Sequence, residues 1–246
     1  MKIIVIIIGF ILTVGSFANA KTANEYYQEG MQLKEAGKLE EALSTYNKVI
    51  ELEPKFAGVR VNKANLLGKM GRIEEAIKTF EEAIALNPKD PEVWYNRGTT
   101  YFGMKKYNEA YLDLDKAVKL DPKDKEKWYN RGLALANLQK HDEAIFSLDE
   151  ALKIDPTWVM PIAQKVAIES SRKNYKMSIK YAEEIIKMHP NKMGGYNMKA
   201  QALSNMKKYK EAITFFKKGL EAEPNGKPAS IDFVKNEIKR LEVLSK

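Results

Sequence analysis

A proline that returns at a fixed interval constrains the fold of this chain of 246 residues more than any other feature. Six prolines follow one another at intervals of 34 residues, with no insertion or deletion between them. A fixed period of this length is typical of stacked supersecondary units, because each unit buries its apolar face against its neighbours. The six are Pro54, Pro88, Pro122, Pro156, Pro190 and Pro224.

The period divides the chain into six units, and each is predicted to hold two helices. Most units have a small residue at their eighth and twentieth positions and a large apolar residue at their twenty-fourth. Small residues let two helices approach closely, and the bulky residue fills the space between neighbouring pairs. The proline follows the second helix, which it cannot continue, and Gly37 and Gly71 lie at the turns between helices. The units are 23–56, 57–90, 91–124, 125–158, 159–192 and 193–226.

The fifth unit departs most from the pattern. Val166 and Ile185 are larger than the pattern expects at their positions, while Ala182 replaces the Tyr, Phe or Leu of the other units. We interpret these exchanges as partial volume compensation, which packed cores tolerate best.

The tail, residues 227–246, is predicted to be a capping helix. Its apolar residues recur at helical spacing, and such a helix would cover the apolar face that the last repeat of a stack leaves open. These residues are Ile231, Val234, Ile238, Leu241 and Leu244.

The N-terminus has the pattern of a secretory signal peptide. Lys2 provides a positive start, an almost unbroken apolar run extends from Ile3 to Val14, and Ala18-Asn19-Ala20 ends the segment with small residues. The alternative, a retained membrane anchor, needs about 20 apolar residues, and this run is shorter. We therefore expect residues 1–20 to be removed after Ala20, with no membrane span remaining, and the protein to be periplasmic or secreted.

The composition gives no sign of catalysis. The chain has no cysteine, and its two histidines, His141 and His189, occupy positions that other units fill with other residue types. No metal-ligand spacing, phosphate-binding loop or nucleophile elbow is present. We expect no enzymatic activity, no catalytic residues, no metal and no cofactor.

The net charge of +8 comes from 41 basic and 33 acidic residues, which are interspersed rather than gathered in blocks. This distribution favours a solvated surface over a nucleic-acid-binding site. An anionic polymer of the cell envelope is the alternative partner.

The columns of the third and fourth units resemble the tetratricopeptide repeat family. The resemblance covers residues 23–226 and implies an all-α fold, a right-handed α-solenoid of six 34-residue helix-turn-helix repeats followed by the capping helix. The residues that carry it are Trp94, Gly98, Tyr101, Ala110, Ala117 and Pro122 in the third unit, and Trp128, Gly132, Leu135, Ala144, Ala151 and Pro156 in the fourth.

In this family the first helices line a concave groove, and their second, fifth, sixth and ninth positions tend to point into it. The sixth positions here carry five consecutive amides, an arrangement that resembles the asparagine ladder in the repeat domain of O-linked N-acetylglucosamine transferases. An amide has both a donor and an acceptor, so a column of amides can pair with the peptide groups of an extended chain. The column comprises Gln28, Asn62, Asn96, Asn130 and Gln164, with Asn65, Tyr95, Tyr129, Thr99 and Phe102 around it.

The same Tyr-Asn-Arg-Gly sequence at Tyr95 and Tyr129 is common in these repeats, so helix packing is the alternative interpretation of the amides. Two functions stay open at this point. The first is an exported scaffold that binds an extended peptide or a partner domain in its concave groove. The second is a component of a cell-envelope assembly that docks through its convex face or its ends.

Overall fold

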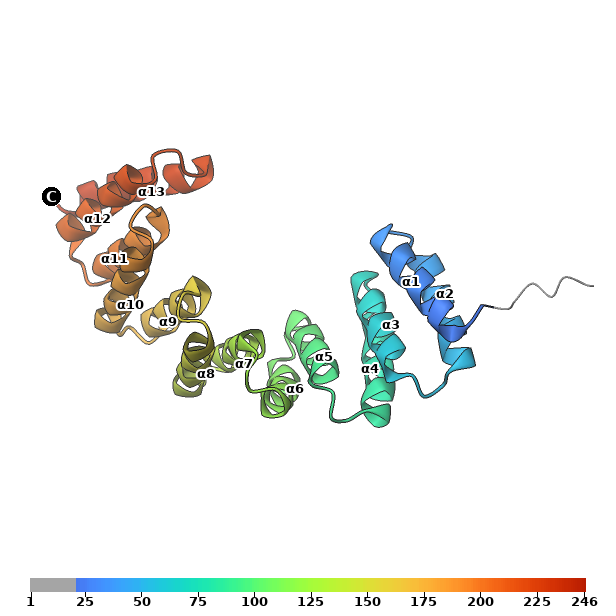
Figure 1. Ribbon diagram of the computed structural model, residues 1–246. Helices are drawn as coiled ribbons and strands as arrows, with labels where there is room; N and C mark the ends of the chain where they lie inside the picture. The colour runs from blue at the N-terminus through green and yellow to red at the C-terminus, as the bar shows by residue number, and fades with distance from the viewer. Residues whose placement is uncertain (1–20) are drawn as a thin grey trace, which may run out of the picture. The chain divides into compact units, whose positions relative to one another are not determined.

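The computed structural model describes residues 21–246, which divide into two compact units, residues 21–79 and residues 80–246. The predicted signal peptide lies outside the described residues. All regular secondary structure in residues 21–246 is helical (Figure 1). The boundary between the two units falls inside the fourth helix, and each unit is described below by itself.

Six helical pairs and one last helix follow one another in the described part of the chain, as the sequence predicts. The first helices of the pairs are α1 (Ala23–Glu35), α3 (Ala57–Lys69), α5 (Pro91–Gly103), α7 (Lys125–Asn137), α9 (Val159–Ser171) and α11 (Met193–Asn205). The second helices are α2 (Leu39–Leu52), α4 (Ile73–Leu86), α6 (Tyr107–Leu120), α8 (His141–Ile154), α10 (Tyr175–Met188) and α12 (Tyr209–Ala222), and the last helix is α13 (Pro228–Leu244).

The turn inside each pair contains one residue with left-handed backbone. Gly37 and Gly71 occupy this position with φ of 76° and 78°, as expected for glycine, which adopts this conformation without a steric cost. The other four pairs place a non-glycine residue at the same position with φ between 59° and 62°. These residues are Lys105, Gln139, Lys173 and Lys207.

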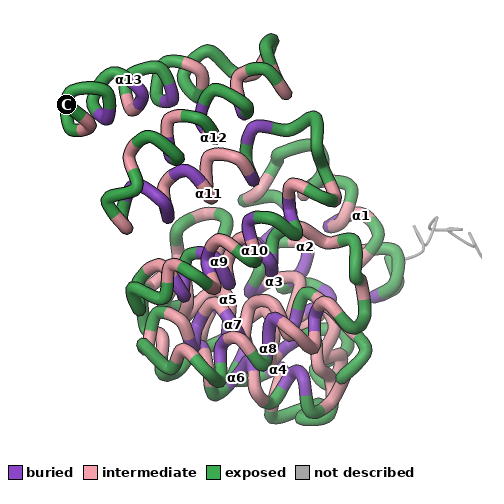
Figure 2. Tube along the Cα trace, turned by 90° about the vertical axis from the view of Figure 1, so that its left-hand side faces the viewer, coloured by how far each residue is buried: buried purple, intermediate pink, exposed green. Residues whose placement is uncertain are grey.

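The small and bulky columns meet in the cores of both units. In residues 21–79, a Cβ atom on Gly30 would lie 2.6 Å from the ring of Tyr46, which is fully buried. In residues 80–246, a Cβ on Gly98 would lie 2.9 Å from Cγ of Leu114. The eighth position is therefore small because the twenty-fourth residue of the same pair packs directly on its backbone. Buried residues recur along the helices, while the turns between them are exposed (Figure 2).

The fifth repeat inverts this pairing. Val166 stands where other repeats have Gly or Ala, and Ala182 stands where they have a bulky residue. Both are buried in one cluster with Ile162 and Ile185. The larger residue at the eighth position thus accompanies the smaller one at the twenty-fourth.

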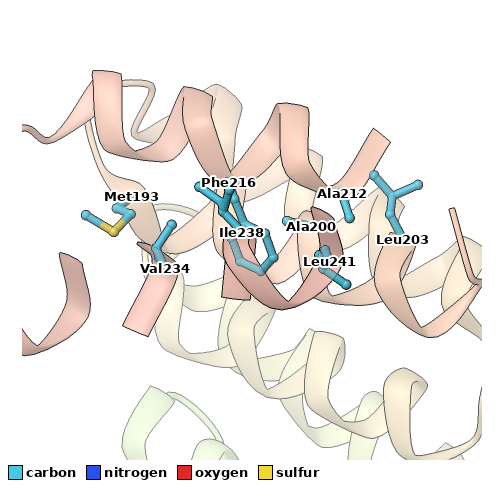
Figure 3. Packing of buried hydrophobic residues seen from close by; sticks show 8 residues of the cluster. All are labelled: Met193, Ala200, Leu203, Ala212, Phe216, Val234, Ile238 and Leu241. Atoms are coloured by element: carbon cyan, nitrogen blue, oxygen red, sulfur yellow. The ribbon is translucent and has the colours of Figure 1, made fainter. Parts of the chain in front are cut away.

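Helix α13 covers the last pair. Its buried residues Val234, Ile238 and Leu241 belong to one cluster with Phe216 of α12 and with residues of α11 such as Met193 (Figure 3). Leu244, the last of the predicted apolar residues, remains 49% exposed, so the last turn of α13 contributes little to covering the last pair.

Candidate peptide-binding face of the first helices

In residues 21–79, the predicted amides lie on α1 and α3. The side chain of Asn62 donates a hydrogen bond from Nδ2 to the hydroxyl of Tyr27 over 2.6 Å, and the ring of Tyr27 lies 5.2 Å from that of Phe56. Gln28 and Asn65 are exposed. Asn62 therefore braces α3 against α1 and keeps its second N–H and its oxygen for other partners.

In residues 80–246, the same bracing joins α7 to α5. Asn130 donates from Nδ2 to the hydroxyl of Tyr95 over 3.0 Å and to the carbonyl of Glu126 over 2.9 Å. Both N–H groups of Asn130 are thus used, and only its Oδ1 remains as an acceptor. Burial, followed by the nearby carboxylates of Glu126 and Asp124, raises the pKa of Tyr95, so its hydroxyl stays neutral at physiological pH.

The two tyrosine–asparagine pairs have the same spacing, because a fifth-position tyrosine accepts from the sixth-position asparagine 35 residues later. Asn96 has no such partner, since the residue 35 positions earlier is Val61, which lacks a hydroxyl. No hydrogen bond of the Asn96 side chain is found among the described residues. Of the three asparagines, Asn96 therefore has the most unused donors and acceptors.

Three other candidates take part in packing. The ring of Tyr129 lies 4.8 Å from that of Trp158, and the ring of Phe102 lies 5.4 Å from that of Tyr107. The hydroxyl of Thr99 donates to the carbonyl of Asn96 over 3.0 Å. Gln164 is half-buried on α9. The two aromatic residues also pack against buried clusters.

Lys127 is a buried cation that sequence reasoning missed. It is 1% exposed at a position where Val59 and Val93 are buried in earlier repeats. Its Nζ lies 2.6 Å from a carboxylate oxygen of Glu92 on α5 and 2.6 Å from one of Asp124, the N-cap of α7. Burial lowers the pKa of Lys127, but the hydrogen bonds to these carboxylates outweigh burial and raise it. Lys127 thus remains charged and fixes α7 against α5.

A column of basic residues at the seventh position provides further links between consecutive helical pairs. In residues 80–246 the column begins with Arg97, which makes a bidentate bond to Asp113 within its own pair at 2.7 and 2.8 Å. The next three reach back to a carboxylate on the second helix of the preceding pair. These three bonds are Arg131 to Asp115, Lys165 to Asp149 and Lys199 to Glu183. The sequence alone could have predicted these ion pairs, because the basic residues and their acidic partners each recur every 34 residues.

Neither histidine forms part of a cluster of potential metal ligands, and none of the described residues forms a group of three or more His, Asp or Glu side chains able to hold a metal ion. His189 lies at the C-cap of α10, and Nδ1 of His141 is buried without a hydrogen-bond partner. Over residues 21–246, no helix combines the length and the apolar character that crossing a membrane requires.

Sequence models of the tetratricopeptide repeat match most of the chain. The chain belongs to the tetratricopeptide repeat family. The matched residues end at 157 and resume at 194, so they leave out the fifth repeat, residues 159–192, which departs from the pattern. The matched residues are 64–105 for the model described as TPR repeat, and 25–56, 45–78, 91–124, 126–157 and 194–225 for models described as tetratricopeptide repeat.

Solved tetratricopeptide structures share the fold of this chain at low identity. A repeat protein from Parabacteroides merdae matches with a TM-score of 0.72 at 20% identity, over 90% of this chain and 87% of its own. The protein pilF of Pseudomonas aeruginosa matches with a TM-score of 0.65 at 16% identity, over 90% and 96%. YrrB, described as having an unusual peptide-binding site, matches with a TM-score of 0.62 at 18% identity, over 73% and 93%. No curated protein sequence matches the chain.

Proposed function

We propose that this protein is an exported scaffold that binds an extended peptide or a partner domain through the first helices of its repeats. Family membership supports the general role, since tetratricopeptide proteins are interaction scaffolds. The observation that carries the finer proposal is that the sixth-position amides retain unused hydrogen-bonding groups: a whole amide at Asn96, an oxygen at Asn130, and an oxygen and one N–H at Asn62.

Each amide has a distinct role in this proposal. Asn96 accepts from a peptide N–H and donates to a peptide carbonyl, so it makes more hydrogen bonds to the peptide than the other two asparagines. Asn130 only accepts, because both its N–H groups are used inside the fold. The bonds from Asn62 and Asn130 to tyrosine hold the amides in fixed orientations before a peptide arrives, and preorganisation of this kind lowers the entropy lost on binding.

The test is capture of partners from an envelope extract of the source cell with residues 21–246. The same capture uses a variant with Asn62, Asn96 and Asn130 changed to Ala, and a matched control with Asn108, Asn137 and Asn205 changed to Ala. The control asparagines are exposed and lie outside the sixth-position column. A partner held by the parent and the control but lost from the ladder variant supports the proposal, while a partner held by all three refutes it.

A second function has its own observation. Leu112 on α6 and Phe146 on α8 share the twenty-second position of their repeats and are 65% and 54% exposed. Second helices line the convex face in this family, so these side chains favour an assembly component that docks there. Changing both to Ser would remove binding in this case and would leave groove binding intact.

The proposal includes export, with cleavage after Ala20 and a location in the periplasm or the medium. Its support is the order of basic, apolar and small residues at the N-terminus. N-terminal sequencing of the protein recovered from the source cell is expected to begin at Lys21. Recovery of a chain that begins at Met1 would contradict export by this signal. An anionic envelope polymer remains an additional partner to test with the same material.

A further inference from the structure

Three repeats of residues 80–246 place an aromatic side chain at their fourth position against the proline near the end of the preceding repeat. The indole Nε1 of Trp94 donates to the carbonyl of Pro88 over 2.9 Å, and that of Trp128 donates to the carbonyl of Pro122 over 2.9 Å. In the last repeat, the hydroxyl of Tyr196 donates to the carbonyl of Pro190 over 3.1 Å. In all three repeats an aromatic side chain donates a hydrogen bond to the carbonyl of a proline six residues earlier.

The fifth repeat lacks this aromatic residue. Its fourth position is Ile162, which is 4% exposed and has no donor. No described residue donates a hydrogen bond to the carbonyl of Pro156, the equivalent acceptor. In residues 80–246, the acceptor that three repeats satisfy with an aromatic side chain is therefore left to other partners in the fifth.

A pocket of about 440 Å³ opens at this place. Leu152 at the end of α8, Ile162 on α9 and Met188 at the end of α10 provide its apolar walls, and Pro156 lies beside them. Leu152 and Met188 pack against the buried cluster that contains Ile162, so the walls are anchored in the core. Glu184 and Lys187 complete the lining with one charge of each sign, so the pocket favours neither a cationic nor an anionic occupant.

We propose that the pocket beside Pro156 binds a tryptophan side chain of a partner polypeptide. The indole N–H donates to the carbonyl of Pro156, as the indoles of Trp94 and Trp128 do to their own prolines. The ring packs on Leu152, Ile162 and Met188, where the thioether makes a favourable sulfur–aromatic contact. Tryptophan suits such a site because one ring combines a large apolar surface with a single donor.

This inference goes beyond the proposed function. The pocket is built from the ends of α8 and α10 and the start of α9, and none of its lining residues belongs to the amide column. A partner can therefore anchor here whether or not the amides bind a peptide. The ladder variant described above is expected to bind the aromatic probe as the parent does, which separates the two proposals.

The test follows the methyl resonances of Ile162 and Met188 in methyl-labelled protein during titration with N-acetyl-L-tryptophanamide. Saturable shifts of both methyls are expected. The 1-methylindole analogue of the probe, which lacks the N–H, is expected to bind about 3- to 10-fold more weakly, because one hydrogen bond is lost. Equal binding of the two probes, or no shift at either methyl, would overturn the proposal.

The variant Ile162→Trp tests the same geometry from inside the chain. The new indole is expected to occupy the pocket, donate to the carbonyl of Pro156 and abolish the probe-induced shift at Met188. Val243→Trp, which adds an indole at a 71% exposed position of α13, is the matched control and is expected to leave probe binding unchanged. If circular dichroism shows that Ile162→Trp does not fold, Met188→Lys places a charge on the pocket wall, and loss of the Ile162 shift is then expected. Unchanged probe binding in the folded variant would overturn the proposal. A shift of these methyl resonances with protein concentration alone would also overturn it, because the pocket would then be occupied by a second copy of the chain.

Discussion

Replacing Glu169 by leucine is expected to stabilise the protein, although the change removes a charged residue from an ion pair. Glu169 is 4% exposed on α9, and its Oε2 is buried without a hydrogen-bond partner. Its Oε1 lies 3.7 Å from Nη1 of Arg172, which makes a closer contact of 2.6 Å with Asp142. Four of the other five repeats have leucine at this position, Leu33, Leu67, Leu135 and Leu203.

The magnitude follows from three contributions. A buried polar atom without a partner costs about 1–3 kcal/mol, and a fully buried leucine contributes about 1.5–3 kcal/mol. Two costs reduce this gain. Loss of the contact with the exposed Arg172 costs about 0–1 kcal/mol, and the imperfect fit of leucine in a core packed around glutamate costs about 1–3 kcal/mol. The net gain is about 2 kcal/mol, which corresponds to about 4–8 °C in the melting temperature of a chain of this size.

The assay is thermal unfolding followed by circular dichroism, together with hydrogen exchange of the α9 amides, because stacked repeats unfold in coupled steps. Glu143→Leu on α8 is the matched control, since Glu143 is exposed, and its effect is expected within about 0.5 kcal/mol. An unchanged or lower melting temperature for Glu169→Leu would show that the orphan oxygen has a partner in solution and would refute the reasoning.

Three further predictions concern packing and charge. Gly98→Ala is expected to destabilise the fold by about 1–3 kcal/mol, because the new Cβ meets Leu114 at 2.9 Å. Its control Gly103→Ala, whose Cβ has nothing within 4 Å, should be neutral or stabilising by up to about 1 kcal/mol. Equal urea midpoints for the two variants would contradict this prediction. Lys127→Ala should cost about 2–3 kcal/mol, because it leaves the carboxylates around Lys127 without their cation and opens a cavity, and an unchanged urea midpoint would show that the buried ammonium contributes no net stability. Hydrogen bonds from Lys125 and Thr157 lower the pKa of Asp155 from 3.8 to about 2. The contribution of this carboxylate to stability is therefore present above pH 3.8 and disappears as the pH falls through about 2. A carboxyl titration by NMR checks the pKa, and a midpoint near 3.8 would rule out the bond to Lys125 in solution.

Sequence reasoning anticipated the parts of the fold that depend on volume and period. The contact between Gly98 and Leu114 follows from two columns of residue size, and the turn glycine Gly37 follows from backbone sterics. Lys105 at the equivalent turn could not be predicted from residue type, because a lysine carries no local preference for left-handed backbone. The repeat itself imposes that conformation there.

The candidate site was harder to predict, because hydrogen bonds between helices depend on their stagger. The column of amides was visible, but the bond from Asn130 to Tyr95 required the relative position of α5 and α7. The buried charge of Lys127 was missed for a different reason, because lysine is normally a surface residue. Comparison with Val59 and Val93, the apolar residues at the same position of earlier repeats, would have identified it.

The most direct test of groove binding is site-specific photo-cross-linking to the captured partner. A photoreactive phenylalanine analogue replaces Asn65 or Thr99 on the first helices, and Leu112 or Lys180 on the second helices. The proposed function predicts adducts at Asn65 and Thr99 and none at the other two positions. Adducts at Leu112 and Lys180 alone would contradict it and would place the partner on the second helices.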